Sequence, residues 1–478
     1  MIQYTTHSKK QGINTSQASL DKDVFAIPVD NKWLLHAPLH EFNALLDNND
    51  LKTIKNNQVE GFDQELMVIN ELVRRKGHIT PTKKTGALKE EFIVFVTTRG
   101  CNLQCTYCHF DGPTSAKNSL SFDNAKNVID WSIERIVNKT KGSKKKKKLP
   151  IHFFGGEPFT TFDLIKDIVN YTNEQCSDYG IEPFFMATTN GVLTESMRTW
   201  IIKHFHKIII SIDGTAETHD KHRPISEYLG SFEPASETAD ILSKSKVELH
   251  IRACITSETV TKMLSMVEYM VNRWHPSGIK VEPLTENILT KVASLYPPDP
   301  AIFAKNWYDA FCYLREVGID FAYTPINPGE PRLSSCLVGN DAIVVHPDGS
   351  LNACYLTPED WSKHGMNLQM GSISTDGEVI IEQTNVLNIR EMVAHKNKCE
   401  NCFCKYSCAG GCHVTNTYLG STKHYNDFCI GTRLISACLM LDSIGCESLI
   451  ERFLNKADCA EQTLSQSSDR LSVNHSIK

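Results

Sequence analysis

Short apolar segments alternate with amphipathic segments through the middle of the chain. The apolar segments have the length and composition of buried strands, and they lie at 92–96, 151–154, 184–187, 208–212, 247–251 and 279–281. Between them, apolar residues recur at helical spacing near 121–138, 161–177, 194–204, 235–245 and 257–273. This alternation predicts parallel βαβ units, arranged either as an open doubly wound sheet or as a partial barrel.

Both arrangements place an active site at the carboxyl ends of the parallel strands. Cys101, Gly155, Thr189 and Asp213 each follow a predicted strand at that end. We therefore expect these residues to meet at one edge of the sheet.

The amino-terminal part of the chain has a different pattern. Residues 1–22 are polar and are predicted to be flexible. Residues 23–85 combine two strand patterns with two amphipathic helical patterns, which lie at 24–29, 32–36, 40–57 and 63–76. This combination predicts a small α+β domain.

The carboxyl-terminal part loses the alternation. Residues 286–335 read as a linker or bridging region with a helix near 299–316, and residues 336–430 are rich in cysteine, glycine and turn residues. A helix is predicted over 431–454, and the polar tail 455–478 is predicted to be disordered.

Charge and hydropathy exclude several classes of protein. The 478 residues include 50 basic and 56 acidic side chains, a formal net charge of −6, so we expect no general binding to nucleic acid or to anionic membranes. The first ten residues lack an apolar stretch that could act as a signal peptide, and no 18 consecutive residues are apolar. We therefore expect a cytoplasmic protein, in a compartment where cysteines serve as metal ligands or redox groups.

The 17 cysteines are clustered. One group has the spacing C-x3-C-x2-C and consists of Cys101, Cys105 and Cys108. A second has the spacing C-x2-C-x5-C-x3-C and consists of Cys399, Cys402, Cys408 and Cys412, with Cys336 and Cys354 before it and Cys429 after it. The others mostly read as small buried hydrophobic residues, and they are Cys176, Cys254, Cys312, Cys404, Cys438, Cys446 and Cys459.

The first cysteine group suits a [4Fe–4S] cluster. Its three thiols follow a predicted strand and would leave one iron without a protein ligand. A structural zinc ion would need four ligands, and His109 could supply the fourth. The spacing alone leaves both readings open.

The residues around this group resemble a known family. Residues 96–108 (VTTRGCNLQCTYC) resemble the cluster loop of the radical S-adenosylmethionine (radical SAM) superfamily, and residues 153–158 (FFGGEP) are similar to its GGE motif. Residues 188–191 and 211–214 resemble its recurrent segments at later strand ends. The resemblance covers residues 90–285, and it implies that the strands form a partial (β/α)6 TIM-type barrel.

The resemblance implies a mechanism. The open iron chelates S-adenosylmethionine, and one electron, from a donor such as flavodoxin or ferredoxin, cleaves the sulfonium to give a 5′-deoxyadenosyl radical. That radical abstracts a substrate hydrogen, while the protein supplies positioning and excludes water. Three cysteines would bind the cluster, and they are Cys101, Cys105 and Cys108.

The resemblance also assigns cofactor contacts. Backbone around Gly155, Gly156 and Glu157 would receive the ammonium group, glycine allowing a close approach. The remaining predicted contacts are Tyr107 beside the adenine, Ser211 and Asp213 near the ribose or carboxylate, and Arg252 on the carboxylate. Each has a plain structural alternative: the Gly-Gly and Asp-Gly pairs also suit tight turns, and Arg252 also suits a surface strand.

The second cysteine region is similar to the SPASM extension of peptide- and protein-modifying radical SAM enzymes. The similarity spans residues 336–430 and implies two auxiliary [4Fe–4S] clusters, three clusters in all. The outer one would be held by Cys399, Cys402, Cys408 and Cys429, and the inner one by Cys336, Cys354 and Cys412. Either the fourth inner position is open to a substrate thiolate or amide, or Cys312 or Cys404 fills it. The alternative is a structural zinc module.

Two enzymatic functions compete. Maturases of ribosomally made peptides cross-link a precursor peptide, whereas anaerobic sulfatase maturases oxidise cysteine or serine to formylglycine. The latter family has an aspartate, its proposed base, directly after the second auxiliary cysteine, where this chain has Tyr355. We therefore expect a peptide maturase that installs a cross-link. Tyr355 is a weak catalytic candidate, because it could also simply pack.

Two further alternatives stay open. Residues 23–85 could recognise a leader peptide through a strand edge, or could form a structural cap. A non-enzymatic iron–sulfur electron carrier would need neither the GGE motif nor an open iron.

Overall fold

The structure is a computed structural model. It describes residues 2–4, 19–59, 61, 63–89, 92–108, 110, 119–139, 147–286, 288–327, 329–414, 425–455 and 470–471. His109 and Cys459, and most of the tail predicted to be disordered, lie outside the described residues.

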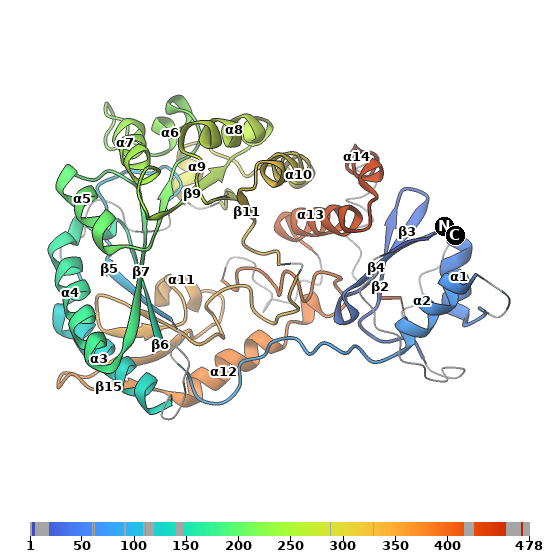
Figure 1. Cartoon of the computed structure of the whole chain (residues 1–478), viewed down its shortest axis with the longest axis horizontal. Helices are drawn as coiled ribbons and strands as arrows, with labels where there is room; N and C mark the ends of the chain where they lie inside the picture. The colour runs from blue at the N-terminus through green and yellow to red at the C-terminus, as the bar shows by residue number, and fades with distance from the viewer. Residues whose placement is uncertain are drawn as a thin grey trace.

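A parallel sheet forms the centre of the molecule. Its core strands are β5 (Phe92–Thr98), β6 (Lys147–Gly155), β7 (Ile181–Thr189), β8 (Lys207–Ser211), β9 (Glu248–Ile255) and β10 (Gly278–Pro283). Neighbours pair in chain order and in parallel. Helices cover the outer side of the curved sheet (Figure 1). The prediction of an α/β partial barrel is confirmed.

The outer helices connect successive strands. They are α3 (Phe122–Lys139), α4 (Phe162–Tyr179), α5 (Glu195–His204), α7 (Phe232–Leu242) and α8 (Met263–Trp274). Local signals set their ends: Thr194 caps α5 by accepting a hydrogen bond from the Met197 amide, and α4 ends at Gly180 in the left-handed region. A short helix, α6 (Ala216–His222), precedes α7 and was not predicted.

The sheet continues beyond the predicted strands at both edges. In the described part of the chain it has eleven strands. β11 (Asp320–Ala322) pairs in parallel with β10, and β12 (Ala342–Val345) pairs in parallel with β5. Three antiparallel strands then follow β12, namely β13 (Ser350–Asn352), β14 (Gln369–Ile373) and β15 (Val379–Ile381). The cysteine-rich region therefore shares a sheet with the barrel and covers its edge.

The amino-terminal unit is a four-stranded antiparallel sheet with two helices. Its elements are β1 (Gln3–Tyr4), β2 (Phe25–Val29), β3 (Lys32–Ala37), β4 (Phe42–Leu46), α1 (Asn48–Asn56) and α2 (Gln64–Arg74). The helix predicted from residue 40 was wrong in its first half. Phe42 and Leu46 are buried as part of β4, and the Asp47 capping box begins α1 only afterwards.

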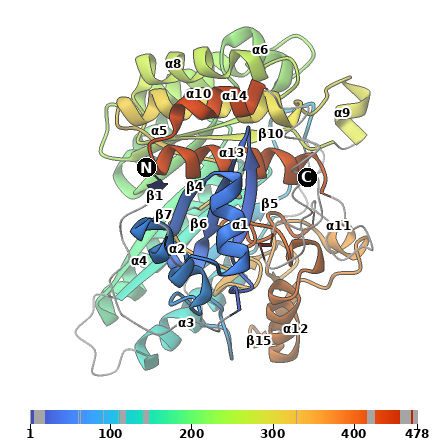
Figure 2. The same ribbon diagram turned by 90° about the vertical axis from the view of Figure 1, so that its right-hand side faces the viewer.

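Two carboxyl-terminal helices link this unit to the barrel. α13 (Asp427–Ser443) packs against α10 (Pro300–Glu316), and α14 (Glu447–Asn455) follows. The single helix predicted over 431–454 is therefore two helices, because Gly445 between them has a φ of 69°. The amino-terminal sheet lies beside α13 in both views (Figures 1 and 2), and Asn43 donates to the Ser443 hydroxyl at 3.3 Å.

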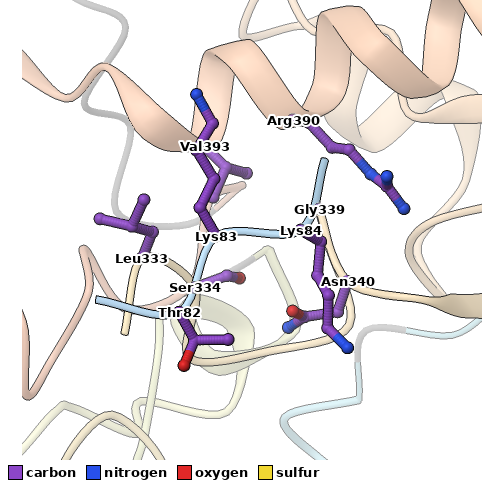
Figure 3. Close-up of a pocket in the computed structure, with 9 residues that line it drawn as sticks. All are labelled: Thr82, Lys83, Lys84, Leu333, Ser334, Gly339, Asn340, Arg390 and Val393. Atoms are coloured by element: carbon purple, nitrogen blue, oxygen red, sulfur yellow. The ribbon is translucent and has the colours of Figure 1, made fainter. Parts of the chain in front are cut away.

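The remaining elements are short or peripheral. They are the helices α9 (Ile288–Val292), α11 (Pro358–Ser362) and α12 (Gln383–Ala394) and the 3-10 turns Pro38–His40, Pro158–Thr161, Val260–Lys262 and Asn397–Cys399. The segment that leaves the amino-terminal unit passes beneath α12, where Thr82, Lys83 and Lys84 line a small cavity (Figure 3). Among the described helices, none is long and apolar enough to cross a membrane.

Candidate active site

The first cysteine group lies on a loop at the carboxyl end of β5. Cys101, Cys105 and Cys108 are half-buried. The Leu103 amide donates to the Cys101 sulfur at 3.4 Å, and the Phe110 amide donates to the Cys108 sulfur at 3.3 Å. Burial raises the pKa of Cys101 to about 11 and that of Cys105 to about 12. Neutral thiols with oriented amides are suited to bind iron on release of their protons.

The GGE turn pairs directly with the cysteine loop. The Gly156 amide donates to the Thr98 carbonyl at 3.0 Å, and the Glu157 amide donates to the Gly100 carbonyl at 2.9 Å. A Cβ at Gly155 would lie 2.2 Å from the Thr98 oxygen, and one at Gly156 would lie 2.2 Å from the Gly100 oxygen. Both glycines therefore permit two strand ends to approach each other, a requirement that is independent of any cofactor.

Glu157 joins a third strand end to this pair. Its buried carboxylate accepts hydrogen bonds from the Thr189 hydroxyl at 2.8 Å, the Asn190 amide at 2.7 Å and the Phe159 amide at 3.1 Å. Burial raises its pKa to about 7, against the effect of these donors. The Asn190 side chain then donates to the side-chain oxygen (Oδ1) of Asn102 at 2.7 Å, next to Cys101. The ends of β5, β6 and β7 therefore meet, as the strand pattern predicted.

Two predicted cofactor contacts, Tyr107 and Asp213, touch each other. Asp213 is fully buried, and one carboxylate oxygen accepts hydrogen bonds from the Tyr107 hydroxyl and from Arg223 Nε, the latter at 3.0 Å. The other oxygen accepts from the Cys254 amide at 2.9 Å. Burial alone would raise the pKa of Asp213, but Arg223 lowers it below its usual range. The predicted cofactor roles of Tyr107 and Asp213 stay predictions.

Ser211 and Arg252 lie side by side on neighbouring strands. They are register partners, with Ser211 at the end of β8 and Arg252 in the middle of β9. Ser211 is buried, whereas Arg252 is exposed, and within the described part of the chain its side chain has no hydrogen bond or ion pair. An exposed guanidinium beside the end of β8 can bind a carboxylate.

The comparison with protein families decides the identity of this part of the chain. Residues 95–270 match the model of the radical SAM superfamily, and they include the whole cysteine loop, the GGE turn and β5 to β9 except the first residues of β5. This is a radical SAM domain. The chain therefore contains a radical SAM domain, and this family implies a [4Fe–4S] cluster and S-adenosylmethionine as its cofactors.

Relatives extend the match beyond the radical SAM domain. A cysteine-type anaerobic sulfatase-maturating enzyme of Clostridium novyi is 26% identical over 326 residues, which cover 65% of this chain and 84% of that enzyme. The radical SAM cyclopropyl synthase TigE of Paramaledivibacter caminithermalis is 22% identical over 349 residues, which cover 67% of each. The solved structure of native anSMEcpe with bound AdoMet and Cp18Cys peptide matches with a TM-score of 0.56 and 18% identity, covering 77% of this chain and 99% of that one.

The residues of the radical SAM domain fit these cofactors. Three half-buried thiols lie on one loop, and three cysteines at this spacing are ligands of the kind that iron–sulfur clusters use. The described residues contain no three His, Cys, Asp or Glu side chains arranged around a single metal ion. When bound, the cofactors would supply the radical chemistry, and the protein holds the cysteine loop through the GGE turn.

Five cysteines line one cavity in the second cysteine region. The cavity is bordered by the four cysteines predicted for the outer cluster and by Cys404. Cys404 lies next to Cys402, with which it shares a hydrogen bond. The structure thus groups Cys404 with the outer set and not with the inner one.

The inner cysteines form a separate group. Cys354 lies near enough to Cys336 and Cys412 for each to raise its pKa, after the larger effect of burial, which brings that pKa to about 12. Cys312 lies elsewhere, on α10 beside Tyr308. In the described part of the chain, neither alternative fourth ligand therefore lies in the inner group.

Sequence reasoning missed three cations near the cysteine groups. Arg433, fully buried on α13, donates to the Cys402 sulfur at 3.2 Å and stacks between Phe403 and Tyr425. Lys396 donates to the backbone carbonyl oxygens of Leu333, at 2.5 Å, and of Ala409. Arg223 pairs with Asp213. The place of Arg433 four residues after Cys429, on one helix face, was the available signal.

Proposed function

We propose that this radical SAM enzyme abstracts a hydrogen from a ribosomally made precursor peptide and installs a cross-link in it. The observation that carries the proposal is the position of Tyr355. Its ring stacks on Phe154 of β6 with a centroid distance of 4.5 Å, one residue before the GGE turn. The residue after the second auxiliary cysteine therefore borders the strand ends, and it supplies a phenol where formylglycine formation calls for a carboxylate base.

The relatives support a substrate of this class. One of them is named for sulfatase maturation, which acts on a protein, and another for cyclopropane synthesis, which makes carbon–carbon bonds. A solved relative holds a peptide together with AdoMet. A reaction that forms a new bond within a peptide substrate agrees with what the names of these three proteins say.

Three [4Fe–4S] clusters are part of the proposal. One is held by Cys101, Cys105 and Cys108, an inner auxiliary cluster by Cys336, Cys354 and Cys412, and an outer one by Cys399, Cys402, Cys408 and Cys429. The grouping of these cysteines supports it. The proposal also includes an electron donor such as flavodoxin or ferredoxin. It further includes a location in the cytoplasm, the reducing compartment that the iron–sulfur clusters need.

Anaerobic reconstitution tests the proposal. We expect ~12 iron per chain, since three cubes are proposed, and dithionite-dependent release of 5′-deoxyadenosine. Cys105→Ala should abolish that release and remove about a third of the iron. The matched control is Cys176→Ala, at a buried cysteine of α4 outside every proposed site. Full iron without 5′-deoxyadenosine would contradict the enzymatic role.

The peptide substrate needs its own assay. Short reading frames encoded beside this gene supply candidate precursors, and a mass loss of two hydrogens in one of them, with a new link found by fragmentation, is the expected result. A product with unchanged mass from every candidate would contradict cross-linking.

Sulfatase maturation is the second candidate function. It is favoured by the match to 84% of the length of the Clostridium novyi sulfatase-maturating enzyme. The discriminating substrate is a sulfatase peptide that contains the cysteine or serine to be oxidised. Formylglycine in that peptide, detected by its aldehyde, would replace cross-linking as the function.

Peptide recognition by residues 23–85 is also a proposal. Both outer edges of the amino-terminal sheet carry short segments of the same chain, Gln3–Tyr4 on β4 and Arg470 on β2. A leader peptide that adds a strand would displace one of them. Its binding should therefore compete with a synthetic peptide of either segment, as measured by fluorescence anisotropy.

A further inference from the structure

The cysteine loop has a second support opposite the GGE turn. The Gln104 amide donates to the Pro224 carbonyl at 2.8 Å, and the Thr106 amide donates to the His222 carbonyl at 2.9 Å. The Thr106 hydroxyl donates to the same His222 oxygen at 3.2 Å. The segment after α6 therefore runs beside the half of the loop that carries Cys105.

An ion pair connects this segment to the loop. Arg223 Nε lies 3.0 Å from the Asp213 carboxylate, which also accepts the Tyr107 hydroxyl. The Arg223 guanidinium carbon lies 5.3 Å from the centre of the Tyr107 ring. Tyr107 thus contacts both members of the pair, between Cys105 and Cys108 in sequence.

A directed chain of hydrogen bonds holds Arg223 in place. The Asp213 amide donates to Nδ1 of His219 at 3.2 Å, and Nε2 of His219 lies 2.9 Å from the Ser231 hydroxyl oxygen. The Ser231 hydroxyl donates to the Arg223 carbonyl at 2.5 Å. Burial lowers the pKa of His219 to about 4, so the ring is neutral and its two nitrogens have the opposite roles that this chain requires.

Such a network is costly unless each group is satisfied. Asp213, His219 and Ser231 are fully buried, and replacing a buried ion pair by apolar residues is often neutral or stabilising. Stability alone does not account for it. Its position does: the backbone amides on either side of Cys105, those of Gln104 and Thr106, donate to the carbonyl groups on either side of Arg223, so the two residues lie on adjoining segments.

We propose that Arg223 is a positioning residue for the radical SAM cluster, held by Asp213 and Tyr107 so that its fixed positive charge stands beside Cys105 and stabilises the reduced cluster. Asp213 and Tyr107 then serve the cysteine loop rather than the nucleoside. A cluster gains an electron more easily next to a cation, because the added negative charge is partly compensated. The inference rests on the radical SAM domain and is independent of the peptide substrate.

Opposite charge changes test the proposal. The full-length variants Arg223→Gln and Asp213→Asn are reconstituted anaerobically, and the reduction potential is titrated with EPR detection. The cluster in question is the one whose spectrum changes when S-adenosylmethionine is added. We expect a more negative potential in Arg223→Gln and a more positive one in Asp213→Asn. A purely structural role would move both in the same direction or neither, and either result would overturn the proposal.

Two further variants separate charge from folding. Arg198 forms a bidentate pair with Glu237, with both N–O distances 3.0 Å, between α5 and α7 and outside the cysteine loop. Arg198→Gln should lower the Tm and leave the potential unchanged. If Arg223→Gln retains no cluster, Arg223→Lys keeps the charge without the Nε–H donor, and we expect it to retain the cluster at a potential near that of the native enzyme. A potential as negative in Arg198→Gln as in Arg223→Gln would contradict a local charge effect.

Discussion

The carboxylate of Glu157 accepts three hydrogen bonds, from the Thr189 hydroxyl and from the Asn190 and Phe159 amides. In the sequence, Glu157 is visible only as the last residue of the GGE motif. Its two oxygens connect the end of β6 to the end of β7, and its own amide connects β6 to the cysteine loop. One buried residue therefore positions three strand ends. The position of Glu157 therefore requires a side chain with two acceptor oxygens, independently of its contacts with the cofactor.

Glu157→Gln tests that requirement. A glutamine amide nitrogen would face the Thr189 hydroxyl or the Asn190 amide, so one donor would lose its acceptor. We expect a loss of about 1–3 kcal/mol in unfolding free energy, the cost of a buried unsatisfied donor, and slower 5′-deoxyadenosine release. Thermal unfolding and a cleavage assay measure the two effects. An unchanged free energy of unfolding in Glu157→Gln would show that these hydrogen bonds do not stabilise the protein.

The five-cysteine cavity gives a second residue-scale prediction. A cube of four irons uses at most four of the five thiols. We expect Cys404→Ala to keep the full iron content and Cys402→Ala to lose about a third of it. Iron analysis after anaerobic reconstitution compares the two neighbouring thiols. An equal loss in both variants would mean that Cys404 is itself a ligand.

At the scale of elements, β12 couples the two cysteine regions. It pairs in parallel with β5, and Val344 packs with Val94 and Val96 in a small core of its own. β5 leads into the first cysteine loop, and β12 leads through β13 to Cys354. The two regions are therefore held at a fixed spacing by backbone hydrogen bonds.

Val344→Pro should break this coupling. Proline cannot donate to the ladder, and β12 is flanked by β5 on one side and β13 on the other. We expect a loss of about 3 kcal/mol or more and loss of iron from both regions. The control Val379→Pro is placed in the edge strand β15, where the same change should cost less. Equal iron loss in both variants would contradict a special role for β12.

Strands with long apolar runs were predictable from the sequence, and the exceptions have physical reasons. β11, β12 and β13 have only three or four residues and lie among glycines, cysteines and turns, so no periodicity identifies them. β4 was read as helix because Phe42 and Leu46, four residues apart, also satisfy helical spacing. Pairing with β3, a tertiary contact, decides between the two.

The cysteine groups were predictable for a different reason. Ligands of one cluster recur at short spacings on a loop, and a spacing is visible in a sequence. Arg223 has no such signal, because its partners Asp213 and Tyr107 come from other segments, 10 and 116 residues earlier in the chain. Contacts of this kind appear only when the chain is folded.

At the scale of the whole molecule, a small set of polar contacts joins the amino-terminal unit to the cysteine-rich region. Asp23 is buried, and its oxygens lie 2.9 Å from Lys405 Nζ and 2.8 Å from the Tyr406 hydroxyl. Burial alone would raise the pKa of Asp23, but Lys405 and Tyr406 lower it, so the carboxylate is charged at neutral pH. The unit proposed to receive a peptide is thereby fixed next to the outer cysteine group.

Asp23→Ala should separate peptide modification from radical formation. Without the carboxylate, the half-buried Lys405 keeps an unpaired charge and Tyr406 a buried hydroxyl without this acceptor, so the contact between the two units weakens. We expect faster proteolysis of the connecting segment 78–89, several-fold slower peptide modification and unchanged 5′-deoxyadenosine release in the absence of peptide. Glu174→Ala, at an exposed position of α4, is the matched control. If Asp23→Ala instead slows both reactions equally, the amino-terminal unit supports the barrel as a cap, and peptide recognition has to lie elsewhere.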